Sequence, residues 1–354
     1  MPVNLISHSS ILLGKEEKKA LREVLAGEQL AQGAETAKFE QEAADFVGVK
    51  GGVAVNSGTA ALHLALLSLG VKKGDEVILP SFVCSAPLLA VLYLGAKPVF
   101  ADINLSDYNL CWQDAARKIS SRTKALILPH MFGFPADIGN FLRLGVPVIE
   151  DCAHSLGAKY KNKRIGSFGK IAVCSFYATK MICTGEGGML LSDSRKILAV
   201  VRDLREYDQK NIFRIRYNYK MTELQAALGR VQLKKISGFI RLRKKIASDY
   251  TNCFKQYEKI ILPGTAENSE AVFFRYIIRL GKKSAKFIQE LNRQGIIARR
   301  PVFQPLHRYF KKNVFLPFTD EAYEKTVSLP IYPALKEQEK KRVMSAVSSL
   351  VCED

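Results

Sequence analysis

The sequence has 354 residues, of which 47% are hydrophobic and 25% are charged, a balance that is typical of soluble globular proteins and excludes a largely disordered chain. Its length allows one large domain, or a large domain with a smaller companion. The formal net charge of +19 favours anionic partners. Because the basic residues are spread along the chain in short runs, we expect a phosphate-bearing small molecule rather than nucleic acid.

From about residue 50 the sequence alternates short apolar runs with helical patterns such as 59–69 and 85–94. We expect strands at 53–55, 76–79, 98–101, 125–128, 146–149, 171–176 and 189–191. Several runs are continuously apolar, which indicates a sheet buried on both faces. Strand and helix alternating at this spacing predict an α/β fold with a mostly parallel central sheet flanked by helices.

The pattern changes near Met221. A long amphipathic helix is expected at 222–254, followed by a strand at 273–280 and a helix at 284–294. We therefore predict a large domain of residues 1–245 and a smaller C-terminal α+β domain of residues 246–354.

The first motif that indicates chemistry is Ser57-Gly58-Thr59, where the expected strand 53–55 runs into a helix. A helix N-terminus presents unpaired N–H groups and favours phosphate. Gly58 would let the backbone approach such a group, and the Thr59 hydroxyl can add a hydrogen bond. Serine and threonine are also common helix caps, so the motif alone leaves both interpretations open.

The second motif is an apolar strand that ends in Glu150-Asp151-Cys152-Ala153-His154. Ligand sites in open α/β sheets lie beyond the carboxyl ends of the strands, and Asp151 is better placed than Glu150 to project there. Such a carboxylate can hold the ring nitrogen of a cofactor protonated. It can equally form a turn or cap a helix.

The third motif is the run 171–176, which delivers Ser175 and leads to Lys180, just before the glycine-rich segment 184–188. A lysine whose pKa is lowered by burial and neighbouring charge can form a Schiff base with a carbonyl compound. Taken together and in this order, the three motifs are specific, and they resemble those of enzymes that hold pyridoxal 5′-phosphate (PLP) on a lysine, here Lys180.

With these motifs the sequence resembles the fold-type-I PLP enzymes, in particular the DegT/DnrJ/StrS-type sugar aminotransferases. The resemblance extends from about Asn56 to Leu233 and is weaker towards the C-terminus. Its further landmarks are Gly74-Asp-Glu-Val-Ile, Gly95-Ala-Lys-Pro-Val-Phe, Gly166-Ser-Phe-Gly and Tyr217-Asn-Tyr-Lys-Met-Thr-Glu-Leu-Gln-Ala-Ala.

The resemblance implies a role for each motif. Lys180 would be the catalytic lysine, and Asp151 would pair with the pyridine nitrogen of PLP. The phosphate would be held by Gly58, Thr59 and Ser175, with help from Asn218 of a neighbouring subunit in a homodimer. Ala153 would pack on one face of the ring. His154 would donate a hydrogen bond near the ring hydroxyl, with a structural histidine as the alternative.

The sequence departs from the family pattern at two positions. Cys84 stands where many relatives place an aromatic residue on the cofactor ring, and whether Phe82 stacks instead is left open. Lys220 stands where arginine is frequent, which keeps the charge but loses bidentate recognition. His130 and His307 lie in recognisable landmarks, and we assign neither a role.

Other site types find little support. The seven cysteines include no CxxC pair, which is typical of reduced thiols. The five histidines lack metal-ligand spacing, so no metal site is expected. Neither a signal-peptide pattern nor an unbroken apolar stretch of membrane-spanning length is present. We expect a cytoplasmic protein that binds neither membranes nor nucleic acid.

By resemblance, the function would be transfer of an amino group from an amino acid, with glutamate expected, to a keto group of a nucleotide-linked sugar. A nucleotide-sugar dehydratase on the same fold is the nearest alternative, but in that branch a histidine replaces the lysine at position 180. A non-enzymatic regulatory protein is the alternative of a different class. The basic charge favours this alternative, but the sequence shows no appended DNA-binding module.

Overall fold

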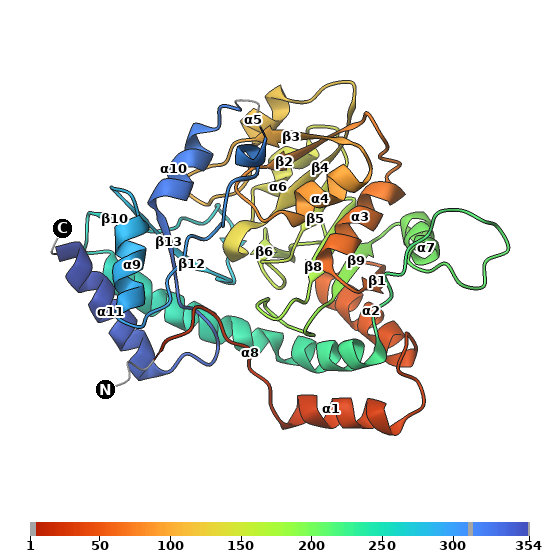
Figure 1. The fold of residues 1–354 in the computed structure, drawn as a ribbon, viewed down its shortest axis with the longest axis horizontal. Helices are drawn as coiled ribbons and strands as arrows, with labels where there is room; N and C mark the ends of the chain where they lie inside the picture. Colours follow the sequence, from red (N-terminus) through yellow and green to blue (C-terminus); the bar gives the residue numbers. More distant parts are fainter. Residues whose placement is uncertain (1–4, 311–313, 353–354) are drawn as a thin grey trace.

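The computed structural model describes residues 5–310 and 314–352 (Figure 1). Its centre is a seven-stranded sheet in the order β1-β9-β8-β5-β4-β2-β3. The strands are β1 (Gly51–Val55), β2 (Glu76–Pro80), β3 (Lys97–Ala101), β4 (Thr123–Pro129), β5 (Val148–Asp151), β8 (Ile171–Ser175) and β9 (Gly188–Ser192). All seven predicted strands are present. Only β9 runs antiparallel to its neighbours, so the prediction of a mostly parallel sheet is confirmed.

Successive residues of each strand point to opposite faces of the sheet, and both faces are covered. One face carries Val53, Ile127 and Val173, which pack under α3 (Gly58–Ser68), α4 (Ala86–Tyr93) and α7 (Arg195–Leu204). The other face carries Ala54 and Leu126 among others, and it packs against α2 (Ala34–Val47) and α8 (Glu223–Phe254). The short helices α5 (Trp112–Arg117) and α6 (Ile138–Leu142) add to this second layer. The continuously apolar strands are thereby explained.

A separate hydrophobic core lies under the C-terminal part of the chain. There β12 (Tyr276–Leu280) pairs with β10 (Ile260–Ile261) and β13 (Thr326–Leu329) in antiparallel fashion. The helices around them are α9 (Ala285–Arg293), α10 (Pro317–Lys325) and α11 (Glu337–Cys352). A third, small sheet joins β6 (Lys159–Tyr160), β7 (Lys163–Arg164) and β11 (Ser269–Glu270).

The long helix α8 links the two cores (Figure 1). Its first half packs on α1 (Lys15–Ala26) and α2, and residues from Ile246 onward belong to the C-terminal core. The predicted domain boundary at residue 245 therefore falls inside a continuous helix, and the division into 1–245 and 246–354 stays a prediction. Among the described residues no helix is long and apolar enough to cross a membrane.

Candidate functional site

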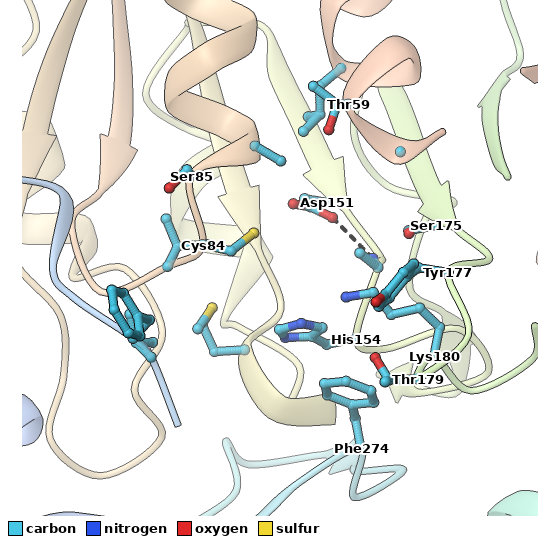
Figure 2. Close-up of a pocket in the computed structure, with 18 of the residues that line it drawn as sticks. Thr59, Cys84, Ser85, Asp151, His154, Ser175, Tyr177, Thr179, Lys180 and Phe274 are labelled. Atoms are coloured by element: carbon cyan, nitrogen blue, oxygen red, sulfur yellow. Dashed lines mark hydrogen bonds between the residues drawn. The ribbon is translucent and has the colours of Figure 1, made fainter. Parts of the chain in front are cut away.

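A cavity of about 470 Å³ opens at the carboxyl ends of β5 and β8, where the N-terminus of α3 also lies. Figure 2 shows side chains from these elements pointing into it. Among the predicted site residues, those that line the cavity are Gly58, Thr59, Asp151, Ala153, His154, Ser175 and Lys180. Three segments that are far apart in the sequence or lie on different strands thus meet at one place, beyond the carboxyl ends of strands.

The N-terminus of α3 lies directly against the end of β8. The Ser57 side chain accepts a hydrogen bond from the Ala60 N–H at 3.1 Å, so this serine is the helix cap. A Cβ atom on Gly58 would lie 2.9 Å from the Ser175 Cβ, so a glycine is required for this close approach. The Ser175 side chain is thereby placed beside the first turn of α3, and the helix start combines a cap with a setting suited to phosphate.

Asp151 is buried and is the last residue of β5. Its carboxylate accepts a hydrogen bond from the Ala153 N–H at 3.0 Å, drawn as the dashed line in Figure 2. Burial raises the pKa of this carboxyl, while the Ala153 N–H and the charge of Lys180 act in the opposite direction. The residue therefore does form a turn, and its carboxylate also borders the cavity.

The neighbouring Glu150 has a different role, because successive strand residues face opposite sides. Its buried carboxylate accepts hydrogen bonds from His130 Nε2 at 3.1 Å and from the backbone N–H groups of Gly166, Phe168 and Gly169. Burial alone would raise its pKa, but these donors lower it. Glu150 thus fixes the 166–169 turn, and the choice of Asp151 over Glu150 as the cavity carboxylate agrees with the geometry.

His130 belongs to this structural group. Its Nδ1 accepts the Ala136 N–H at 3.0 Å, so its Nε2 donates to Glu150. In the described residues, His130, Glu150 and Cys152 form the one group whose ligand atoms lie within 4.8 Å of one another. All three are buried and the first two are engaged in hydrogen bonds, so this arrangement gives no support to a metal site.

Lys180 follows β8 after a turn closed by its own N–H and the Tyr177 carbonyl at 2.9 Å. Its side chain extends into the cavity (Figure 2), and its amine lies 5.1 Å from the centroid of the Phe274 ring. Burial lowers the pKa of this amine, and the negative charge of Asp151 partly opposes the shift. An amine with a lowered pKa in a cavity is the form needed for attack on a carbonyl group.

His154 is stacked on Phe274, with ring centroids 4.2 Å apart, and it faces Phe132 at 6.1 Å. Burial holds its pKa well below the usual value, and the charges of Lys180 and Arg275 add to this effect. The imidazole is therefore neutral. It has no hydrogen-bond partner within the described chain, so its ring nitrogens can still bond to a ligand, and the choice between a cofactor-binding and a structural histidine stays a prediction.

Several residues of the cavity wall were not predicted. Phe274 and Arg275 lie just before β12, in a segment that we expected only to be a strand. The exposed rings of Phe303 and Tyr309 border the cavity as well. Cys84 lines it, whereas Phe82 is fully buried against Tyr108 and Phe132 and does not. No sequence motif marks Arg275.

The predicted Asn218 and the unassigned His307 lie elsewhere. Asn218 is exposed and outside the cavity of its own chain, and its carbonyl accepts from the Asn56 side chain at 3.3 Å. A role across subunits thus stays a prediction. His307 is buried, with its Nδ1 2.7 Å from the Ser81 hydroxyl, which is a structural contact.

The chain was compared with known proteins. The family model of the DegT/DnrJ/EryC1/StrS aminotransferase family matches residues 12–348. A GDP-perosamine synthase of Escherichia coli O157:H7 is 32% identical, with 93% of each chain covered. A UDP-2-acetamido-2-deoxy-3-oxo-D-glucuronate aminotransferase of Pseudomonas aeruginosa is also 32% identical, over 93% of this chain and 94% of the relative. The solved structure of the aminotransferase TlmJ from Streptoalloteichus hindustanus has a TM-score of 0.95 at 28% identity, with 99% of both chains covered.

Proposed function

Because the chain belongs to the DegT/DnrJ/EryC1/StrS aminotransferase family, we propose that it moves an amino group from an amino acid to a keto group of a nucleotide-linked sugar, with PLP as cofactor. The observation that carries this proposal is that Lys180 and Asp151 border one cavity, at the carboxyl ends of two adjacent parallel strands. An amine of lowered pKa and a buried carboxylate are the two groups that a pyridine aldehyde requires.

The residues present fit the cofactor. The start of α3 with Gly58 and Thr59, next to Ser175, would hold the phosphate through N–H and hydroxyl groups. Asp151 would hold the ring nitrogen protonated, and the small side chain of Ala153 leaves room for a flat ring. A cavity of about 470 Å³ is also within the usual size range of small-molecule sites.

When bound, PLP supplies an electron sink that makes the bonds of an attached amine-bearing carbon easy to ionise. Lys180 would hold the cofactor at rest and, once released, would take the proton from the α-carbon of the amino donor. Burial lowers the pKa of Lys180, so more of its amine is unprotonated and able to accept that proton. The neutral His154 would donate a hydrogen bond to the ring hydroxyl.

The sugar substrate is proposed from the relatives, whose names specify a GDP-linked and a UDP-linked sugar. The net charge of +19 would help to attract a nucleoside diphosphate. Glutamate is proposed as the amino donor. A homodimer, in which Asn218 contributes to the partner's phosphate site, is proposed from the family resemblance.

The test follows the two halves of the reaction separately. Purified protein loaded with PLP should lose its visible absorbance with L-glutamate and release 2-oxoglutarate. It should regain that absorbance with one member of a panel of UDP- and GDP-linked keto-sugars. Lys180→Ala should abolish both the absorbance of the lysine-bound cofactor and turnover. A Lys180→Ala protein that stays fully active would refute the assignment of the lysine.

A further inference from the structure

Arg275 lies on the wall of the cavity, immediately before β12. Its guanidinium carbon is 4.9 Å from the centroid of the Phe274 ring, and the Lys180 amine is 5.1 Å from the same centroid. Both groups thus approach the same aromatic ring. The guanidinium is therefore close to the amine at which the chemistry is proposed.

In the described part of the chain, no acidic residue neutralises this arginine. Within residues 5–310 and 314–352, no carboxylate lies within ion-pair distance of Arg275, whereas Arg279, four positions further along, pairs with Glu321 at 2.8 Å. The hydrogen-bond partner of Arg275 is His8. Burial, together with the charges of Arg275 and Arg299, lowers the pKa of His8 to about 2, so this histidine is neutral and accepts the bond.

The positive charge of Arg275 acts on two other groups of the cavity. It adds to the lowering of the pKa values of both Lys180 and His154. Burial and the charge of Arg299 lower the pKa of Arg275 itself to about 10, which still leaves the guanidinium protonated at neutral pH. A partly buried cation without a counterion is costly. An anionic ligand that enters the cavity would remove this cost.

We propose that Arg275 binds the carboxylate of the amino donor, an assignment that rests on the proposed function. A planar guanidinium matches a carboxylate through two parallel hydrogen bonds. In an α-amino acid the carboxylate is attached to the same carbon as the reacting amine, which fits an arginine next to Lys180. In a nucleotide-linked sugar, atoms of the sugar ring separate the phosphates from the keto carbon, so those anions lie further from the reacting amine.

The test uses PLP-loaded Arg275→Gln and Arg275→Lys, with Arg293→Gln as the control for loss of charge. Arg293 is paired with Glu290 on α9 and lies outside the cavity. Two quantities are measured: the rate at which L-glutamate bleaches the cofactor, as a function of concentration, and the affinity for glutarate, an unreactive dicarboxylate. Arg275→Gln should raise the L-glutamate concentration needed for half-maximal bleaching, and weaken the affinity for glutarate, each by about 10- to 100-fold. Arg275→Lys should have a smaller effect on both quantities, and Arg293→Gln should have none.

Titration of the same proteins with UDP and GDP distinguishes the carboxylate of the amino donor from the phosphates of the nucleotide-linked sugar. Unchanged UDP and GDP affinities, with weakened glutarate binding, support the donor assignment. Wild-type glutarate binding in both Arg275 variants, or loss of UDP or GDP affinity to a similar extent, overturns it. Arg275→Lys keeps the charge. If Arg275→Gln does not fold, the glutarate affinity of Arg275→Lys is compared with that of the wild type instead. If no amino acid bleaches the cofactor of the wild-type protein, the proposed function is refuted. The glutarate titration would still show whether Arg275 binds a carboxylate.

Discussion

Gly58 and Ser175 come from different elements of the fold, yet a Cβ atom on Gly58 would lie 2.9 Å from the Ser175 Cβ. We expect Gly58→Ala to force the start of α3 away from β8, at a cost of about 1–3 kcal/mol in unfolding free energy. Because both residues are assigned to the phosphate of PLP, the affinity for PLP should fall as well. Thermal unfolding and a fluorescence titration with PLP measure the two effects.

The control is Gly238→Ala in the middle of α8, where a new methyl group would meet no atom within 4 Å. This substitution should leave PLP binding unchanged and should stabilise the helix by about 0.5–1 kcal/mol. Equal PLP affinities for the two alanine variants would contradict the assignment of Gly58.

Asp151→Asn removes a negative charge while it keeps the shape of the side chain. If Asp151 holds the ring nitrogen protonated, the variant should still bind PLP through Lys180, and turnover should fall by about 10²–10⁴-fold. Single-turnover bleaching by L-glutamate is the measurement. A variant with wild-type turnover would show that Asp151 serves only the turn that its hydrogen bond to the Ala153 N–H closes.

The pH dependence of PLP attachment reports on Lys180. Attachment requires the unprotonated amine, and burial lowers the pKa of Lys180 below its ordinary value of 10.5. The initial rate of absorbance gain in the apoprotein should therefore rise with pH and reach its midpoint below 10.5. In Asp151→Asn the midpoint should move to still lower pH, because the carboxylate that favoured the protonated amine is gone. A shift towards higher pH would contradict this coupling.

Glu223 is a structural residue at the start of α8. Its carboxylate accepts hydrogen bonds from the backbone N–H groups of Gly33, Glu35 and Thr36 and from the Thr36 hydroxyl. Although burial acts to raise its pKa, these donors lower it below the ordinary value of 4.5. Since the pKa is lower in the folded state, the stabilisation is present above about pH 4.5 and is lost as the pH falls through the folded-state pKa.

Glu223→Gln should therefore lower the free energy of unfolding at neutral pH by about 1–3 kcal/mol and weaken its decline in acid. Glu16→Gln is the control, because that carboxylate is largely exposed and should change stability by less than about 0.5 kcal/mol. Urea unfolding at neutral and acidic pH measures both. Equal acid sensitivity of Glu223→Gln and the wild type would refute the assignment.

The sequence was most informative where one physical signal sufficed. Continuous apolar runs predicted all seven central strands, because a sheet covered on both faces needs apolar residues at every position. The reversed direction of β9 was not predictable, since strand direction depends on the connection rather than on composition. α1 and α2 lie before residue 50 and were not predicted. Glu223 from far along the chain caps the start of α2, and no local pattern records such a partner.

The site residues also divide into those that a local sequence pattern marks and those that depend on distant partners. Lys180, Asp151 and the α3 start were predicted because each lies at or just after the end of a strand that the apolar runs had already placed. Arg275 was missed because it lies within the expected strand 273–280 and has no motif around it. Its significance comes from its surroundings: a neutral His8 as hydrogen-bond partner and, among the residues that the structure describes, no carboxylate within ion-pair distance. Burial and pairing of that kind exist only in three dimensions.

The 32-residue helix α8 has a consequence for how ligands reach the cavity. Near the start of its second half, the Arg243 guanidinium donates to the carbonyls of Phe274 and Ile331, at 3.3 and 2.8 Å. A rotation of the C-terminal part relative to the central sheet would have to bend α8 and break these hydrogen bonds of Arg243. We therefore expect substrates to enter and products to leave while the two cores keep their mutual orientation throughout the catalytic cycle.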